Sequence, residues 1–578
     1  MKSRKFFFMM SALVPALLFA QEGSLGDDRT ETAVAAVKTN DAFANPISPV
    51  VYCADPTAIE HNGRIYVYAT NDHQQFIANG HGGKNDYGAI KSLVVLSSAD
   101  MVNWTHHGII PVEQICGSWC YASWAPSIVS RVEEDGLTHF YLYFSNSGGG
   151  VGVITATDPL GPWTSPRNSS LISHSTRGVG DCNAPFDPGA VIDENGVGWV
   201  AFGGGDPNST GTKLMPGNAR IIKLHSDMVN TVGRASEIKA PYMFEASELN
   251  LINGRYVYTY CTHWVDGENW ADYGSTLSPP TACSMTYMVN SGNPLNTDDW
   301  TYRGEYFANP GRMGFDFSNN HTHLQKYRGA YYLFYHTMSL ERLKSSPGNG
   351  FRSVQVNRAP VVENTALIGK VTATNQGPSQ LERVNPYLWQ EAEMMANCGG
   401  IEYEHLACAA NSASNSTADG TLALTDVSPG SWIMVRGVNF NSDSPTLSFI
   451  GRLAGKGILE VRLDDKDAAP AATLNFDSER LTEFQVDGLD ASLFSGLHNV
   501  YLFFASARNV RFDAWTFDDG KANSIRQLPM KTSESESVEY FDLNGRKIKY
   551  GIEGHTGQML IRKTVMDNGV SIVEKIVE

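Results

Sequence analysis

Between residues 50 and 360, short runs of alternating aromatic and aliphatic residues recur after polar or glycine-marked turns. The period of two within each run is typical of β-strands, and the runs return at intervals of roughly 55 to 75 residues. They cover residues 63–68, 139–144, 198–202, 254–260 and 329–335. Because each blade of a propeller needs several strands and turns, this spacing predicts a five-bladed β-propeller over residues 46–365. The alternative is a pair of irregular β-sandwiches, which does not require similar strands at similar spacing.

A second pattern begins after residue 388. Alternating segments at 432–436, 447–450, 458–463 and 500–504 predict a β-sandwich over residues 389–518. The polar stretches 21–45 and 366–388 are predicted linkers, and residues 519–578 a linker with a small β tail. The predicted fold class is therefore all-β: a five-bladed propeller, a sandwich and a short C-terminal tail.

The first twenty residues have the pattern of a cleaved secretory signal. A charged start is followed by an apolar run from Phe6 to Phe19, which is short for a membrane span, and then by the small Ala20. The alternative is a membrane anchor. No later segment contains 18 consecutive apolar residues, so the mature chain is predicted to be secreted, whether periplasmic, cell-surface or extracellular, with no membrane span.

The eight cysteines are compatible with export. The short separations Cys116/Cys120 and Cys398/Cys408 suggest local disulfides, although the sequence does not fix connectivity, and the other four are interpreted as buried free thiols. The spacing of a CxxC zinc site is absent.

Charge and missing motifs exclude several functions. The net charge of -17 disfavours nucleic acid as a partner. The sequence contains no GxSxG elbow and no HExxH helix, and the glycine-rich segment 80–85 lacks the spacing of a phosphate-binding loop.

Three carboxylates stand in otherwise small or apolar surroundings, each next to a predicted strand. They are Asp55, Asp187 and Glu245, in three presumed blades. A carboxylate flanked by apolar residues needs a partner or has a perturbed pKa. Each Asp-Pro alone is more often a turn residue. Three together favour chemistry, because the inner strand of every blade points at one shared axis.

These three segments, together with residues 124–127, 319–323 and 351–358, resemble glycoside hydrolase family 43 over about residues 46–365. The resemblance implies a five-bladed propeller that acts on arabinoxylans and arabinans. It also implies that Asp55 is the general base, Asp187 the carboxylate that orients the acid and tunes its pKa, and Glu245 the general acid. An inverting glycosidase needs one carboxyl group on each side of the bond that it cleaves.

Glu248 is the rival candidate for the acid. If its segment is a regular strand, Glu248 faces away from the axis that Glu245 faces, because odd offsets invert the face. Glu245 is therefore preferred.

Further site residues follow from the same resemblance. It implies that His321 organises a calcium ion or a water cluster at the propeller axis and that Arg358 contacts substrate near the carboxylates. The alternatives are a hydrogen-bonded core histidine and a blade-closing ion pair. Trp124, Phe244 and Trp264 are candidates for stacking on a sugar, although aromatic residues in propellers more often pack between blades.

The second domain resembles carbohydrate-binding module family 6 over about residues 389–518, through segments 389–393, 430–433 and 512–517. That resemblance implies a structural calcium held with Glu391 and Glu393. The aromatic residue that usually stands six positions before Trp432 is here Asp426, so the module either has a displaced site or buttresses the propeller. The C-terminal tail is similar to type IX secretion sorting tails.

The combined prediction is a secreted, inverting, exo-acting glycosidase that releases pentose units from plant cell-wall polysaccharide (arabinoxylan, xylan or arabinan) without an organic cofactor. An α-L-arabinofuranosidase on arabinoxylan is the first hypothesis and a β-xylosidase the second. From a different class, the chain could be a catalytically silent, lectin-like propeller. Three carboxylates at one axis argue against the silent propeller.

Overall fold

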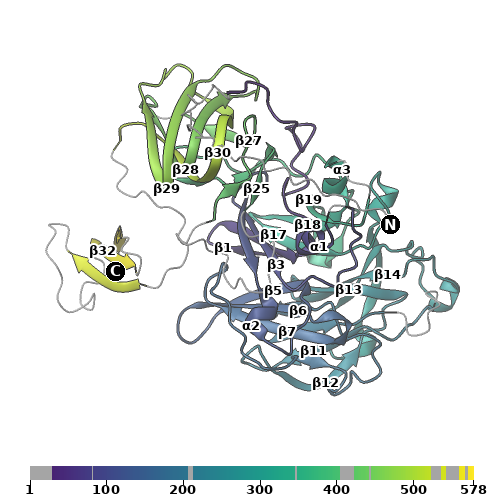
Figure 1. Ribbon diagram of the computed structural model, residues 1–578. Helices are drawn as coiled ribbons and strands as arrows, with labels where there is room; N and C mark the ends of the chain where they lie inside the picture. The colour runs from purple at the N-terminus through teal and green to yellow at the C-terminus, as the bar shows by residue number, and fades with distance from the viewer. Residues whose placement is uncertain are drawn as a thin grey trace, which may run out of the picture.

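The computed structural model describes residues 29–80, 82–205, 213–344, 348–403, 422–441 and 444–521, and the backbone alone of 535–541, 559–566 and 571–577. A ring of small sheets forms the lower body in Figure 1, and a second, curled sheet lies above it. The predicted signal peptide and Cys408 lie outside the described residues. Within those residues, no helix is both long and apolar enough to cross a bilayer.

The ring is the predicted five-bladed propeller. Blade 1 contains β1 (Ala54–His61), β2 (Arg64–Thr70), β3 (Leu93–Ser98) and β4 (Trp104–Ile110); blade 2 contains β5 (Trp124–Val132), β6 (Thr138–Ser145), β7 (Gly150–Ala156) and β8 (Ile172–Ser173). Blade 3 contains β9 (Gly189–Ile192), β10 (Gly198–Phe202), β11 (Arg220–Leu224) and β12 (Thr231–Glu237). Blade 4 contains β13 (Met243–Ile252), β14 (Arg255–Thr262), β15 (Met285–Asn290) and β16 (Thr301–Phe307); blade 5 contains β17 (Thr322–Tyr327), β18 (Ala330–Thr337) and β19 (Ser353–Ala359). Neighbouring strands in every blade are antiparallel.

All five of the alternating runs form the second strand of a blade, namely β2, β6, β10, β14 and β18. A second strand is covered on both faces by neighbouring blades, which explains its aromatic and aliphatic content. One apolar cluster fills each gap between consecutive blades. Five gaps close the ring.

The chain before β1 completes blade 5. The N–H of Ile47 donates to the carbonyl of Val354 (3.0 Å), and the N–H of Cys53 donates to that of Arg352 (2.9 Å). Blade 5 has three strands of its own, so this N-terminal segment takes the outer position and ties the two ends of the propeller together.

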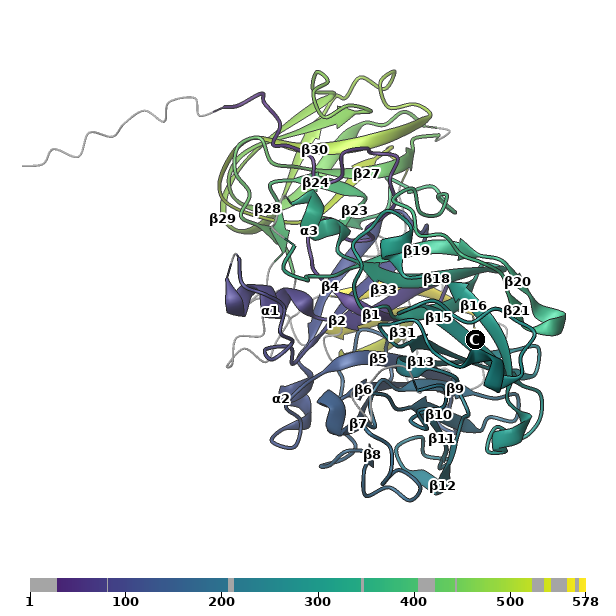
Figure 2. The same ribbon diagram turned by 90° about the vertical axis from the view of Figure 1, so that its right-hand side faces the viewer.

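In the described part of the chain, three short α-helices lie in the loops: α1 (Asp72–Asn79), α2 (Val112–Cys116) and α3 (Ser339–Leu343). Figure 2 shows α1 and α2 beside blades 1 and 2, with α3 close to the upper sheet. A two-stranded ribbon, β20 (Val361–Val362) and β21 (Leu367–Ile368), follows blade 5.

The upper sheet is a curled, eight-stranded antiparallel assembly. Its long central strands are β27 (Trp432–Asn439), β28 (Ser448–Leu463), β29 (Ala472–Asp487) and β30 (Leu497–Asp518), and its short strands are β22 (Gln390–Glu391), β24 (Asn397–Gly399), β25 (Glu402–Tyr403) and β26 (Leu424–Thr425). The tail strands β31 (Ser535–Phe541), β32 (Met559–Met566) and β33 (Ser571–Val577) form a separate sheet.

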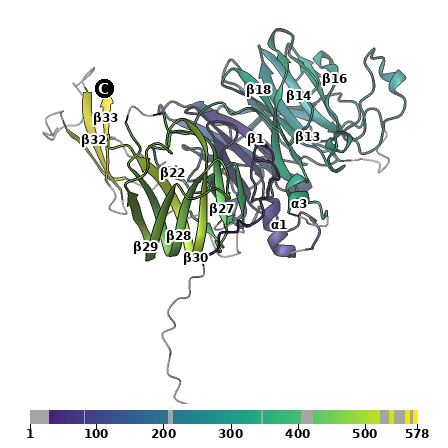
Figure 3. The ribbon, with the colours of Figure 1, turned by 90° about the horizontal axis from the view of Figure 1, so that it is seen from above.

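The propeller and the upper domain share one core. Strand β23 (Met394–Met395) leaves the upper domain and pairs with β4 as a fifth strand of blade 1. One apolar cluster contains Trp104 of blade 1, Phe334 of blade 5 and Phe449 of the upper domain. Seen from above in Figure 3, the two domains lie against one another. The upper domain therefore braces the gap between blades 5 and 1.

The described part of the predicted linker 21–45, residues 29–45, makes specific contacts, and so does the predicted linker 366–388. The N–H of Val34 donates to Gly430 in the upper domain, and the side chain of Asn45 donates to Val356 in the propeller. The N–H of Leu381 donates to Asp100 of blade 1. Both segments therefore run across the junction.

The predicted local pair Cys116/Cys120 is not a disulfide in this structure, and the partner predicted for Cys398 lies outside the described residues. Cys116 and Cys120 are buried free thiols joined by a sulfur hydrogen bond, and Cys398 is also a buried free thiol.

Candidate active site

The innermost strands of four blades carry the same backbone kink within three residues of the point where the strand begins. Asp55, Ala125, Asp187 and Ala246 have positive φ, at 49°, 41°, 49° and 60°, which residues other than glycine seldom adopt. Strain of this kind is retained where a site fixes a side-chain direction. The predicted catalytic residues Asp55 and Asp187 are thus kink residues themselves, and the third, Glu245, directly precedes the kink residue Ala246.

The kinks also connect the blades. Three kink residues donate their N–H to a side chain at the end of the second strand of the preceding blade: Ala125 to Thr70 Oγ1 (2.8 Å), Asp187 to Ser145 Oγ (2.8 Å) and Asp55 to His336 Nδ1 (3.1 Å). The last bond joins blade 1 to blade 5. The closure of the ring therefore positions Asp55 directly.

Asp55 is buried and held in its ionised form. Its Oδ1 accepts a hydrogen bond from Arg352 Nη1 (2.9 Å) and lies 3.7 Å from His321 Nδ1. Burial raises the pKa of this carboxyl, but Arg352 and the two histidines beside it more than offset that effect and bring the pKa down to about 2. A carboxylate that stays ionised at every working pH is suited to the role of general base.

His336 is a neutral partner of this carboxylate. Its Nδ1 accepts the N–H of Asp55, so the ring proton is on Nε2, which donates to Asn319 (3.0 Å). Burial, with Arg352 close by, lowers the pKa of His336 to about 3. The 3.3 Å separation between His336 Nδ1 and Asp55 Oδ1 is therefore not an ion pair.

Arg352, rather than Arg358, is the basic residue at the carboxylates. Arg358 is exposed near the far end of β19, opposite Tyr332, and six residues of strand separate the two arginines by about 20 Å. Arg352 is 2% exposed and forms a bidentate pair with Asp72 (2.9 and 2.8 Å) besides its bond to Asp55. The substrate contact predicted at Arg358 is therefore at the wrong end of β19, and Arg352 is the arginine beside the carboxylates.

Asp72 is a further residue that the sequence analysis missed. It begins α1, is fully buried, and also accepts the N–H of Arg352 (3.0 Å) and the side chain of Asn85 (2.8 Å). Its four acceptor contacts fix the guanidinium against Asp55. The available signal was an acidic residue after the end of a second strand, in the Thr70-Asn-Asp72 segment.

Asp187 connects the base side to the acid side. Its Oδ2 accepts the N–H of Ala246 (2.9 Å) and its Oδ1 a bond from Ser145 Oγ (3.3 Å). Burial raises the pKa of Asp187, the nearby His321 opposes this, and the charge of Asp55 adds to it. Because Asp187 binds the residue next to Glu245, it can both orient that side chain and act on its charge.

Glu245 has the electrostatics of a general acid. Burial raises its pKa well above the ordinary value, and the negative charge of Asp187 raises it further. Asp55 contributes in the same direction. The site therefore contains one carboxyl group that is held ionised and one that is held protonated, which is the division of roles between base and acid.

Glu248 does not face away from the axis, contrary to the expectation from a regular strand. Bulges between Met243 and Glu245 and between Glu245 and Glu248 break the alternation of β13. Glu248 is 1% exposed, and its Oε2 lies 3.3 Å from His323 Nδ1, whose Nε2 lies 3.0 Å from the carbonyl of Ala58. Glu248 is thus committed to a buried pair deeper among the inner strands, and Glu245 is left as the acid.

The aromatic candidates lie around these carboxylates. Trp124 is half-buried and meets Tyr87 edge to face (6.3 Å between ring centroids), and Tyr87 lies beneath the Arg352 guanidinium (5.0 Å). Phe244, next to Glu245, meets His263 edge to face (4.9 Å). Trp124 and Phe244 therefore lie on the two sides of the site.

The predicted metal residues do not form a cage within the described part of the chain. No group of three or more histidine, cysteine or acidic side chains there is arranged to hold a metal. His321 has Asp55 nearby, but Arg352 already occupies that carboxylate, and calcium takes six to eight oxygen ligands. Glu391 is half-buried in β22 and Glu393 is buried two residues on. Calcium at either place stays a prediction.

The upper domain offers no exposed aromatic platform among its described residues, where the large exposed apolar side chains are all leucines. Trp432 is fully buried, and its Nε1 donates to the carbonyl of Val34 (2.8 Å). The N-terminal segment thus covers this tryptophan. Asp426, which replaces its usual aromatic partner, has positive φ (54°) in the turn after β26.

A propeller whose kinked inner strands bring together an ionised base, a protonated acid and a third carboxylate is the scaffold of a glycoside hydrolase. Residues 43–349 match the family model of glycosyl hydrolases family 43, and the chain belongs to that family. It is 32% identical to an arabinoxylan arabinofuranohydrolase of Paenibacillus polymyxa over 93% of this chain and 83% of the relative. It is 35% identical to an arabinoxylan arabinofuranohydrolase of Bacillus subtilis over 82% of this chain and 92% of that one.

A solved structure agrees. The chain resembles a family 43 arabinoxylan arabinofuranohydrolase from Bacillus subtilis in complex with cellotetraose, with a TM-score of 0.75 and 33% identity over 84% of this chain and 99% of the other. The similarity therefore extends across the propeller and into the upper domain.

Proposed function

We propose that this protein is an inverting, exo-acting α-L-arabinofuranosidase that removes arabinofuranose side chains from arabinoxylan. The observation that carries the proposal is the opposite perturbation of two carboxyl groups at one site: the pKa of Asp55 is lowered to about 2, whereas that of Glu245 is raised well above its ordinary value. The names of two relatives that match most of this chain support the substrate.

In this mechanism Asp55 accepts a proton from a water molecule as the water oxygen bonds to the anomeric carbon. Glu245 gives its proton to the glycosidic oxygen as the bond from that oxygen to the anomeric carbon breaks. Asp55 ends protonated and Glu245 ionised, and exchange with solvent restores both. Asp187 keeps Glu245 protonated beforehand and orients it through Ala246. Arg352, which Asp72 holds in position, keeps the base ionised. This chemistry uses no organic cofactor.

The test is a release profile on arabinoxylan, arabinan and xylobiose, with the first product followed by NMR. Arabinose released with inverted anomeric configuration is expected. Retention of configuration would contradict the mechanism, and release of xylose from xylobiose alone would favour the β-xylosidase. If the wild-type protein hydrolyses none of these three substrates, the result would favour a carbohydrate-binding propeller without catalytic activity.

A matched pair of variants assigns the base. Asp55→Ala is expected to abolish turnover of 4-nitrophenyl α-L-arabinofuranoside. Asp193→Ala removes a carboxylate outside the site, on the turn between β9 and β10, and is the control that keeps activity. If Asp55→Ala hydrolyses the arabinoside as fast as the wild type does, Asp55 is not the general base.

We also propose that the protein is exported, from the charged and apolar pattern of residues 1–20. N-terminal sequencing of the protein recovered outside the cytoplasm is expected to start after Ala20. Recovery of the intact N-terminus would contradict cleavage.

A further inference from the structure

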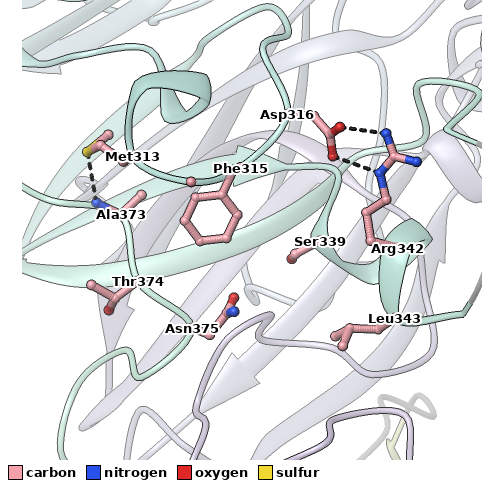
Figure 4. Close-up of a pocket in the computed structure, with 10 residues that line it drawn as sticks. Met313, Phe315, Asp316, Ser339, Arg342, Leu343, Ala373, Thr374 and Asn375 are labelled. Atoms are coloured by element: carbon pink, nitrogen blue, oxygen red, sulfur yellow. Dashed lines mark hydrogen bonds and ion pairs between the residues drawn. The ribbon is translucent and has the colours of Figure 1, made fainter.

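A cavity of about 610 Å³ opens beside blade 5, apart from the carboxylate site. Its walls come from the loop 313–316, from helix α3 and from the segment 373–375 (Figure 4). This volume is within the range of small-ligand sites, about 300 to 1,000 Å³. None of the predicted catalytic residues lines it.

The walls combine one aromatic face with neutral polar groups. Phe315 is half-buried, and Ser339, Thr374 and Asn375 lie around the same space (Figure 4). Asp316 and Arg342 also line it, but they neutralise each other through two hydrogen bonds (2.9 and 2.5 Å). The lining therefore suits an uncharged ligand that has both an apolar face and hydroxyl groups, which describes a sugar ring.

The cavity lies close to the active site along the chain. Ser339 is three residues after His336, whose Nδ1 is 3.3 Å from Asp55 Oδ1, and three residues span at most about 11 Å. Asp316 is five residues before His321, which is 3.7 Å from the same carboxylate, a span of at most about 18 Å. One oligosaccharide can therefore occupy both places.

Two exposed aromatic side chains adjoin the two sites along the chain and contact each other. Trp264 follows His263, which contacts Phe244 beside the acid, and Phe317 follows the cavity residue Asp316. Trp264 and Phe317 are 38% and 47% exposed, and their ring centroids are 6.2 Å apart. Two exposed rings in contact form an apolar surface that leads from the acid towards the cavity.

We propose that this cavity is a distal subsite for the xylan backbone that carries the cleaved arabinose. An uncharged xylo-oligosaccharide segment of that backbone reaches the cavity over Trp264 and Phe317. The inference rests on the proposed function, which supplies a polysaccharide whose backbone continues beyond the cleaved arabinose. It assigns Phe315 the stacking contact and Asn375 a hydrogen bond to a hydroxyl.

The experiment measures xylohexaose binding by calorimetry in the full-length protein and in the variants Phe315→Ala and Asn375→Ala. We expect Phe315→Ala to weaken binding about tenfold, equivalent to about 1.4 kcal/mol, and Asn375→Ala about threefold. Asn375 is exposed, so its variant folds even if Phe315→Ala does not. Tyr331→Ala is the control, because Tyr331 packs half-buried on the same apolar cluster as Phe315 but does not line the cavity.

A kinetic readout separates this inference from the proposed function. The ratio of kcat/KM on arabinosylated xylohexaose to kcat/KM on 4-nitrophenyl α-L-arabinofuranoside is expected to fall about tenfold in Phe315→Ala and to stay unchanged in Tyr331→Ala. Equal xylohexaose affinity in wild type and both cavity variants would overturn the subsite, as would wild-type protein that does not bind xylohexaose. Failure to hydrolyse either arabinoside would overturn the proposed function and leave the binding result standing.

Discussion

Arg352 determines the protonation of the candidate base, and replacing it with glutamine has a specific consequence for the pH profile. The pKa of Asp55 is about 2, against an ordinary value of 3.8, although burial acts in the opposite direction. The difference of about 1.8 in pKa corresponds to roughly 2.5 kcal/mol in favour of the ionised form. Without the guanidinium, burial is opposed only by the smaller effects of the nearby histidines and Thr70, so the pKa of Asp55 is expected to rise above 3.8.

The sign follows from the role of the base, which is active when ionised. In the wild type Asp55 is ionised above about pH 2, so kcat/KM shows no acidic limb from this group near pH 4. In Arg352→Gln an acidic limb is expected at about pH 4 or higher. The assay is kcat/KM for 4-nitrophenyl α-L-arabinofuranoside between about pH 3.5 and 8 at constant ionic strength.

The variant also leaves Asp72 buried without its guanidinium, which costs about 3 to 5 kcal/mol of stability. The double variant Arg352→Gln/Asp72→Asn removes that charge, and Asp72→Asn alone keeps the bond between Arg352 and Asp55. The new acidic limb is expected in Arg352→Gln and in the double variant, but not in Asp72→Asn. The profiles are compared over the pH range in which circular dichroism shows each protein to be folded. A profile of Arg352→Gln that stays flat to pH 4 would refute the reasoning.

Three further outcomes are expected. Glu245→Gln should lower kcat about 10²- to 10⁴-fold on xylan-linked arabinose but much less on a dinitrophenyl arabinoside, whose leaving group needs no proton; equal losses would argue against the acid role. Asp187→Asn should move the basic limb of kcat/KM to lower pH, because burial and then the Asp187 charge raise the pKa of Glu245; an unmoved limb would show that Asp187 only orients. Trp432→Ala should reduce the free energy of unfolding in guanidinium by about 3 to 5 kcal/mol, while the folded protein keeps wild-type turnover. A loss below about 1 kcal/mol would mean that the contact with Trp432 does not hold residues 29–38 in place.

The propeller was predictable because its signal is local and repeated. Each second strand is buried on both faces, so aromatic and aliphatic residues mark it five times in the sequence. Asp55 and Asp187 were predictable for a similar reason, since both precede a proline at the start of an inner strand.

The rest of the site depends on contacts between distant segments. Arg352 directly precedes β19 and Arg358 lies within it, at positions of the same parity, and only the contacts of Arg352 with Asp55 and Asp72 show that the first lies at the site. Bulges in β13 reverse the expected direction of Glu248. Asp72 was missed because its importance comes from an ion pair with Arg352, 280 residues away.

The path of residues 29–45 has a consequence for how the chain is made. The bond between Trp432 and Val34 joins residues 398 positions apart, and the same N-terminal segment then closes the ring at blade 5 and leads directly into the strand of Asp55. The first part of this stretch to leave the ribosome therefore waits for partners about 400 residues later in the chain, and Asp55 gains its contacts with His336 and Arg352 only after blade 5 has been made.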